Sequence, residues 1–115
     1  MLREITSGAR TTMPAITHIA FGSGGVDLSG DPIPPEIDAT GLTNELARYP
    51  ISSVTAPIPT TARYVASIPP LDLASESISE AALVDSEGGV HAIKTFYIKR
   101  KDGGVEFRFT FDDEF

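Results

Sequence analysis

The segment ITHIAFGSGG, from Ile16 to Gly25, joins an apolar run to a loop rich in glycine. The stretch from residue 15 to residue 21 is rich in β-branched and aromatic residues and is bounded by proline and glycine, which predicts a β-strand. Side chains alternate along a strand, so two sets of residues face opposite sides. One face would carry Thr17, Ile19 and Phe21, and the other Ile16, His18 and Ala20.

The glycines after this strand raise the question of a phosphate-binding loop. Gly22 is followed by Ser23, Gly24 and Gly25, but the lysine of a P-loop is missing and no helix is predicted to follow. Without a helix N-terminus, the loop lacks the dipole that helps to hold a phosphate. Residues 22–39 are rich in glycine and proline. We therefore predict an irregular loop in which the glycines allow the chain to turn.

Residues 40–49 show the spacing of a helix. The apolar residues recur at i, i+4 and i+7, and they are Leu42, Leu46 and Tyr49. Thr40 is suited to cap the N-terminus, and Glu45 and Arg48 are spaced to form an ion pair. Pro50 would end the helix. We therefore predict one short helix near residues 41–49.

After Pro50 the apolar pattern changes to the alternation of strands. Strands are predicted at residues 51–56, 62–68, 78–84, 90–99 and 105–111. Glycine-containing turns separate the last three, which is typical of a three-stranded antiparallel meander. The predicted fold is therefore mainly β (α+β), an antiparallel β-sandwich-like domain. A chain of 115 residues makes a single domain, which we assign to residues 14–115 after a flexible N-terminal arm, residues 1–13.

The last predicted strand carries a stripe of aromatic residues on one face, consisting of Val105, Phe107, Phe109 and Phe111, with Phe115 just beyond. Such a stripe indicates either the core face of a sheet or an interface between subunits. We favour the core interpretation, because buried sheet faces commonly have this pattern. The alternative makes Phe107, Phe109, Phe111 and Phe115 a subunit interface.

Composition restricts the partners of this chain. The formal net charge of −7 disfavours nucleic acid, which needs a basic surface. The short basic run Lys99-Arg100-Lys101 precedes a turn and is expected to be a solvated edge. The chain has no cysteine, no secretory signal pattern and no apolar segment long enough for a membrane span, so we expect no membrane association.

No set of residues indicates a catalytic or metal site. His18 and His91 are the only histidines, and each lies in a different predicted strand without a second metal-ligating side chain nearby. Glu80 lies in an apolar strand, where it would act as a buried general acid or pair with Arg48 or Arg63, and we favour the ion pair. We therefore predict no catalytic residues, no cofactor and no metal.

Three segments, taken in order, resemble the N-terminal domain of phage tail-collar fibre proteins. The first follows the pattern T-H-I-A-x-G, the second T-x-L-x-N-E-x-x-R, and the third places an acidic residue before an aspartate turn with glycine. The matching residues are Thr17, His18, Ile19 and Gly22, then Thr40, Leu42, Asn44, Glu45 and Arg48, and then Glu80, Asp85 and Gly88.

The resemblance implies a structural virion protein. It would attach a receptor-binding fibre to the baseplate or tail tip of a contractile tail, assembled in the host cytoplasm. The implied partners are baseplate or tail-tip proteins and a tail fibre, with a homotrimer favoured. Family members continue into a long fibre, whereas this sequence ends at Phe115, so we expect the attachment module to act as an adaptor. The motif residues would hold the fold.

Two other functions stay open at the level of sequence. One is a small β-rich module of a tail tip that binds a carbohydrate or another ligand, for which Tyr49, Tyr64 and Tyr97 are the available tyrosines. The other is an enzyme, for which Glu80 or the acidic run Asp112-Asp113-Glu114 would be the candidates. A non-enzymatic structural role is the prediction that we prefer.

Overall fold

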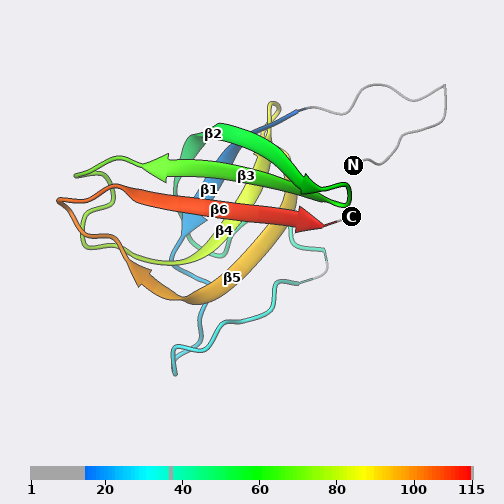
Figure 1. Cartoon of the computed structure of the whole chain (residues 1–115). Coiled ribbons are helices and arrows are strands. Elements are labelled where there is room, and N and C mark those ends of the chain that lie inside the picture. The colour runs from blue at the N-terminus through cyan, green and yellow to red at the C-terminus, as the bar shows by residue number, and fades with distance from the viewer. Residues whose placement is uncertain (1–14, 37, 115) are drawn as a thin grey trace.

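The computed structural model describes residues 15–36 and 38–114, which form six strands and no helix. The strands are β1 (Ile16–Gly22), β2 (Glu45–Ile58), β3 (Thr61–Ile68), β4 (Ser77–Asp85), β5 (Val90–Arg100) and β6 (Phe107–Glu114). They form one sheet in the order β5-β4-β1-β2-β3-β6, and all neighbours are antiparallel (Figure 1). The prediction of a mainly β, antiparallel fold is confirmed. The predicted arm, residues 1–13, lies outside the described residues.

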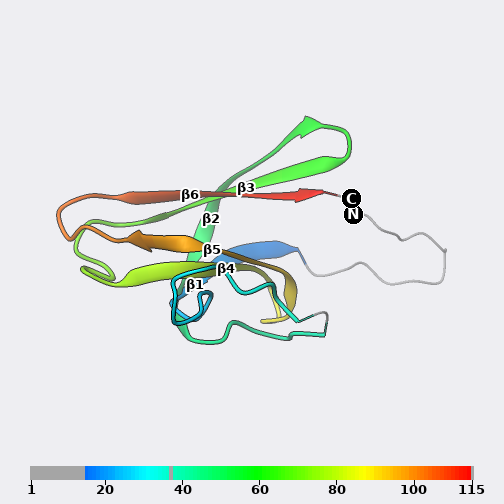
Figure 2. The ribbon, with the colours of Figure 1, turned by 90° about the horizontal axis from the view of Figure 1, so that it is seen from below.

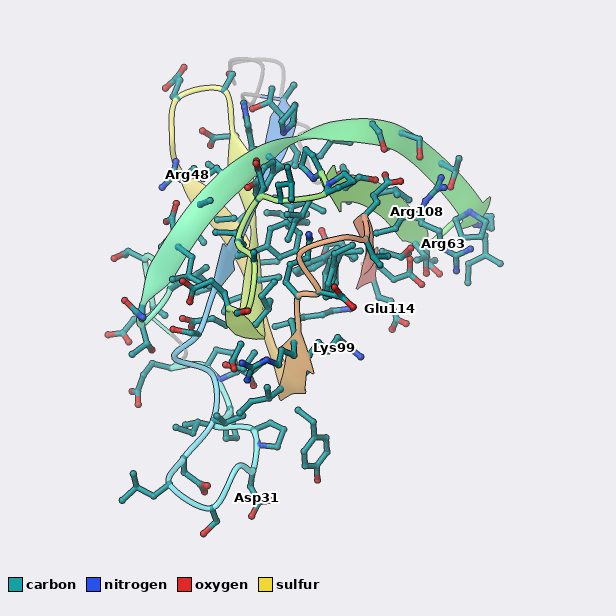
Figure 3. The ribbon with its side chains drawn as sticks, turned by 90° about the vertical axis from the view of Figure 1, so that its left-hand side faces the viewer. Asp31, Arg48, Arg63, Lys99, Arg108 and Glu114 are labelled. Carbon is teal, nitrogen blue, oxygen red and sulfur yellow. The ribbon has the colours of Figure 1, made fainter. Side chains whose placement is uncertain are left out.

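Strand β2 makes the sheet fold over itself. Residues 45–50 of β2 pair with β1, whereas residues 51–58 pair with β3. Pro50 lies at this change of partner, where a missing backbone N–H is tolerated best. Figure 3 shows β2 arching over the molecule, and Figure 2 shows the resulting layers, with β3 and β6 on one side and β1, β4 and β5 on the other. The sheet is thereby nearly barrel-shaped.

The predicted helix near residues 41–49 is wrong. Residues 41–44 belong to the loop between β1 and β2, and β2 begins at Glu45. Phe21 of β1 lies opposite Ala47, and Ala20 lies opposite Arg48, so the backbone of this segment is paired in the sheet. A helix of nine residues is marginal on its own, and pairing with a buried strand outweighs the local spacing.

One of the two strand pairings in the predicted C-terminal meander is wrong. β4 and β5 form the expected hairpin, but β6 pairs with β3 and not with β5. Residues 101–106 carry the chain across one end of the molecule. Two hydrogen bonds join this segment to the loop between β3 and β4: Ser75 N–H donates to Lys101 O, and Leu71 N–H donates to Gly103 O. The predicted solvated edge is wrong at Lys101, whose side chain is buried and whose Nζ donates to Asp102 O.

The main core lies between the two layers. It consists of Ile19, Phe21, Ala66, Ile68, Ile78, Ala81, Leu83, Phe109 and Phe111. The ring of Phe109 lies 5.4 Å from that of Phe21 and 5.3 Å from that of Phe96. Phe107 packs against this cluster from a half-buried position. The core interpretation of the aromatic stripe is therefore confirmed for Phe107, Phe109 and Phe111, and Phe115 lies outside the described residues.

A second apolar cluster covers the opposite face of β1 and β4. Ala20, Ala82 and Val84 form it, and Leu42 from the loop between β1 and β2 packs against it. β4 is therefore buried on both faces, and all but the first of its residues are buried. This burial places Glu80, near the middle of β4, away from solvent.

Candidate functional site

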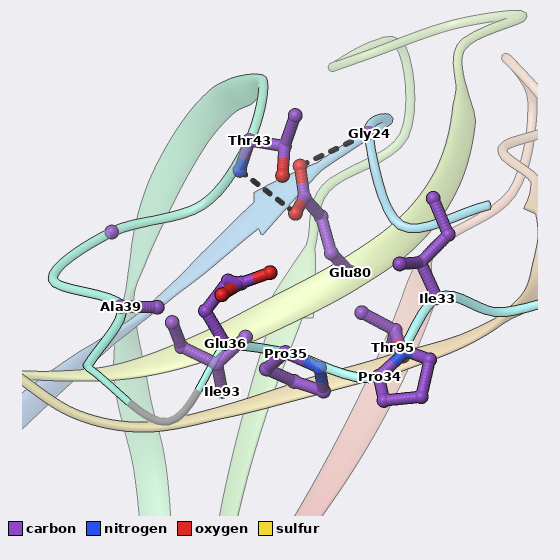
Figure 4. A pocket seen from close by; sticks show the side chains of 11 residues that line it. Gly24, Ile33, Pro34, Pro35, Glu36, Ala39, Thr43, Glu80, Ile93 and Thr95 are labelled. Atoms are coloured by element: carbon purple, nitrogen blue, oxygen red, sulfur yellow. Dashed lines mark hydrogen bonds between the residues drawn. The ribbon is translucent and has the colours of Figure 1, made fainter. Parts of the chain in front are cut away.

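The three segments of the tail-collar resemblance meet around the side chain of Glu80. Glu80 is 1% exposed and lies opposite Gly22 of β1. One carboxylate oxygen accepts hydrogen bonds from the backbone N–H groups of Gly24 at 2.9 Å and Asn44 at 2.8 Å. The other accepts from Thr43 N–H at 3.0 Å (Figure 4). Glu80 thus joins both ends of the loop over residues 23–44 to β4.

This network explains the Gly-Ser-Gly-Gly sequence. A Cβ on Gly22 would lie 2.5 Å from Asn44 O and 2.5 Å from the Glu80 carboxylate, and a Cβ on Gly25 would overlap Ser79 O. The backbone N–H of Gly25 donates to the Ser79 hydroxyl at 2.9 Å. The N–H groups of Gly24 and Gly25 are therefore bound by side chains of β4. These glycines are needed for a close approach of the loop to the sheet.

The predicted partners of Glu80 are wrong, because neither arginine reaches it. Arg48 binds Glu45, with Nε 2.6 Å from a carboxylate oxygen, so the predicted Glu45–Arg48 pair forms, although on a strand. Arg63 binds Asp112 across β3 and β6 with two hydrogen bonds of 2.8 and 3.0 Å. The hydrogen bonds and charge of Arg63 lower the pKa of Asp112.

The turn between β4 and β5 is built on Asp85. One oxygen of Asp85 accepts from Glu87 N–H and Gly89 N–H at 2.8 Å each, and the other lies 2.6 Å from His91 Nε2. These contacts, that to His91 above all, lower the pKa of Asp85. Gly88 has a φ of +87°, which favours glycine. The third motif is therefore a turn, and its aspartate gives His91 the partner that sequence reasoning missed.

The remaining motif residues lie on β1 or in the loop between β1 and β2. His18 is half-buried on β1, and its Nδ1 lies 2.8 Å from Thr17 Oγ1. Thr40 is exposed in the loop. Asn44 donates through its side chain to Ser23 Oγ at 2.6 Å, which adds a second tie across the base of the loop. Among residues 15–36 and 38–114, no group of three or more acidic or imidazole side chains is placed to hold a metal ion.

A cavity of about 180 Å³ lies beside Glu80, between the loop and the sheet. Its lining includes Ile33, Pro34, Pro35, Glu36, Ile93 and Thr95 (Figure 4). This volume is below the range of about 300–1,000 Å³ of ordinary ligand pockets. The oxygens of Glu80 are already bound to backbone N–H groups, so this carboxyl is poorly placed for proton transfer to a ligand.

Sequence reasoning missed the residues that complete the Glu80 network. Gly24 and Thr43 take part through their backbone N–H groups, and Ser79 through a common residue type, so no motif indicates them. Asn44 is a motif residue, but the bond that its backbone N–H donates to Glu80 was not predicted. The usable signal was the acidic residue itself, since a glutamate in an apolar strand needs a buried partner.

Comparison with known proteins adds no relative: no protein-family model matches this sequence, and no curated protein matches it. In the described part of the chain, no helix is long and apolar enough to cross a membrane.

Proposed function

We propose that this chain is a non-catalytic attachment module of a contractile tail, similar to the collar domain of phage tail fibres. It would link a receptor-binding fibre to the baseplate or tail tip, as part of the virion tail. The observation that supports this proposal most is the meeting of separate motif segments at Glu80. Gly22, Asn44 and Glu80 are far apart in the sequence and adjacent in the fold.

The roles of these residues fit a structural protein. Glu80 and Asp85 both use their carboxylates to bind backbone N–H groups, and Glu45 and Asp112 bind arginines. Such contacts stabilise a loop and a turn in one conformation. A module that transmits force between a baseplate and a fibre needs a rigid framework of this kind, with binding surfaces on its loops.

The loop between β1 and β2 is the best candidate for the binding surface. Its described part projects away from the sheet around Asp31 (Figure 3). Leu28, near the tip, is fully exposed, and Ile33 is 44% exposed. Asp27 Oδ1 accepts from Ser29 N–H and Asp31 N–H at 2.9 and 3.1 Å, so the tip has a defined turn. An exposed leucine on an ordered turn offers apolar surface that a partner can bury, which favours association.

Co-purification tests this proposal. The tagged chain is mixed with baseplate, tail-tip and fibre proteins encoded beside it, and its molar mass is measured by light scattering. We expect binding to at least one of them and a trimer. Leu28→Asp should weaken baseplate binding at least tenfold, whereas Leu71→Asp, at a residue 79% exposed in another loop, should not. A monomer that binds none of these proteins would refute the proposal.

The alternative of a carbohydrate-binding tip module has less support. Carbohydrate sites and other ligand pockets usually include aromatic side chains, and the cavity beside Glu80 is lined by none. Tyr97 is 67% exposed on β5, but Tyr49 and Tyr64 are half-buried. A glycan array with the wild-type chain and Tyr97→Ala tests this alternative: hits that Tyr97→Ala abolishes would favour it.

A further inference from the structure

The cavity beside Glu80 contains negative charge without a positive partner. Glu80 is 1% exposed, and Glu36 supplies a second carboxylate to the lining. In the described part of the chain neither carboxylate has an ion pair, because Arg48 and Arg63 bind Glu45 and Asp112. The lining includes no lysine or arginine. Buried charges in proteins are commonly paired with an opposite charge, so this cavity is suited to a cation.

Glu80 has an unused acceptor position. Each oxygen of a carboxylate can accept two hydrogen bonds. Oε2 is saturated, since it accepts from the N–H groups of Gly24 and Asn44 at 2.9 and 2.8 Å. Oε1 accepts only from Thr43 N–H, at 3.0 Å, among the residues that the structure describes. A buried carboxylate oxygen on the cavity lining is therefore able to accept a further hydrogen bond.

The rest of the lining is mostly apolar. Ile33, Pro34 and Pro35 come from the loop between β1 and β2, and Ile93 comes from β5 (Figure 4). The volume of about 180 Å³ suits one side chain, whereas pockets for whole small molecules usually measure about 300–1,000 Å³. Long basic side chains place an aliphatic stem on apolar surface and a charged group at its end. The lining offers a surface for each of these parts.

The rim of the cavity is open to solvent and acidic. The loop residues 33–36 on this rim are exposed. The whole loop, residues 23–44, contains four acidic residues and no lysine or arginine. Its acidic residues are Asp27, Asp31, Glu36 and Asp38. This distribution of charge attracts a basic partner and disfavours an acidic one.

We propose that the cavity beside Glu80 binds an arginine side chain of a partner protein. The guanidinium would donate to Glu80 Oε1 and to the carboxylate of Glu36. The aliphatic stem would lie against Pro34, Pro35 and Ile93. Arginine fits this site better than lysine, because its planar group has five donors in a fixed fork and is more weakly hydrated than an ammonium. The arginine would belong to a baseplate, tail-tip or fibre protein, an identification that rests on the proposed function.

Titration with the amide of N-acetylarginine tests the site without any partner protein. We expect saturable shifts of the backbone amide NMR signals of Thr43, Ile93 and Thr95. The amide of N-acetylcitrulline has nearly the same shape without the charge, and it should bind at least about tenfold more weakly. Equal binding of these two compounds would overturn the proposal. Tighter binding of the amide of N-acetyllysine would overturn the choice of arginine.

Two variants locate the binding site. Glu36→Gln removes one carboxylate of the cavity and keeps the bonds of Glu80, so it should weaken binding of the arginine compound at least about fivefold. Asp31→Asn makes the same change of charge in the same loop, but Asp31 is not part of the lining, so the affinity should stay within about twofold. Equal affinities of the two variants would overturn the proposal.

The titration also separates this proposal from the proposed function. If the arginine compound binds but no baseplate, tail-tip or fibre protein does, the cavity is an arginine site and the attachment function fails. If those proteins bind equally well to the wild-type chain and to Glu36→Gln, and the arginine compound does not bind, the attachment function stands and the arginine site is refuted. Unchanged urea unfolding of Glu36→Gln shows that a loss of binding is not a loss of folding.

Discussion

Replacement of Glu80 gives the sharpest test of the network at the base of the loop. In Glu80→Ala, the N–H groups of Gly24, Thr43 and Asn44 lose their acceptor. An unsatisfied buried donor costs about 1–3 kcal/mol. These three groups are only partly buried, so water replaces part of the lost hydrogen bonding. We therefore expect the unfolding free energy of Glu80→Ala to fall by about 3–5 kcal/mol in total. A domain of this size has an unfolding free energy of about 5–15 kcal/mol, and the variant should be marginally folded.

Glu80→Gln keeps the size of the side chain and changes only its hydrogen bonding. The amide oxygen can retain the bonds from Gly24 and Asn44, but the amide NH₂ then faces the N–H of Thr43. One bond is lost and two donors oppose one another, which should cost about 1–3 kcal/mol. Urea unfolding followed by circular dichroism gives the free energy, and hydrogen exchange at Thr43 should rise selectively.

Glu36→Gln is the matched control, because Glu36 lines the same cavity but is exposed. Its cost should stay within about 0.5 kcal/mol. If Glu80→Gln and Glu36→Gln unfold at the same urea concentration, the buried carboxylate does not hold the loop, and the structural reading of the motif loses its main support.

Three further changes test the rest of the fold. Gly25→Ala should cost about 3 kcal/mol or more in thermal or urea unfolding, because its Cβ would overlap Ser79 O, whereas Gly41→Ala, with open space around it, should be nearly neutral. Phe109→Ala should cost about 3–5 kcal/mol by the same measurement, and an equal cost for the less buried Phe107→Ala would contradict the central place of Phe109 in the core. The pKa of Asp85 is lower in the folded state than in the unfolded state. Between the folded-state pKa and about pH 4, the unfolded chain therefore binds more protons than the folded chain, and the unfolding free energy falls as the pH falls. Asp85→Asn should therefore flatten the acid limb of the unfolding free energy measured from pH 2 to pH 5, and an unchanged slope would refute this assignment.

Much of the strand content could be predicted from local pattern. The alternation in β1 places Ile19 and Phe21 in the main core and Ala20 in the second cluster, as expected for period two. The stripe on β6 likewise places Phe109 and Phe111 in the core. These predictions are correct because the alternation of apolar residues along a strand shows which of its faces is buried. That alternation can be read from a few neighbouring residues.

The candidate site could be predicted only in outline. A glutamate in an apolar strand indicated a special environment, but its partners are backbone groups of a loop that is 36–56 residues away in the sequence. No side-chain pattern identifies backbone donors, so reasoning from residue types turned to the arginines instead. Arg48 and Arg63 were already paired with Glu45 and Asp112, which only the fold reveals.

The sequence by itself determined the class of the fold and the positions of most strands. These features follow from the two-residue period of strands. The glycines after β1 are needed because of close contacts with Ser79, Glu80 and Asn44, which only the fold reveals. Tertiary structure decided the rest: β2 replaced a helix because β1 offers a buried partner, and β6 joined β3 because residues 101–106 cross the end of the molecule. Strand pairing depends on which edges meet in space. The N–H and C=O groups of a free edge form hydrogen bonds with whichever strand the path of the whole chain places beside it.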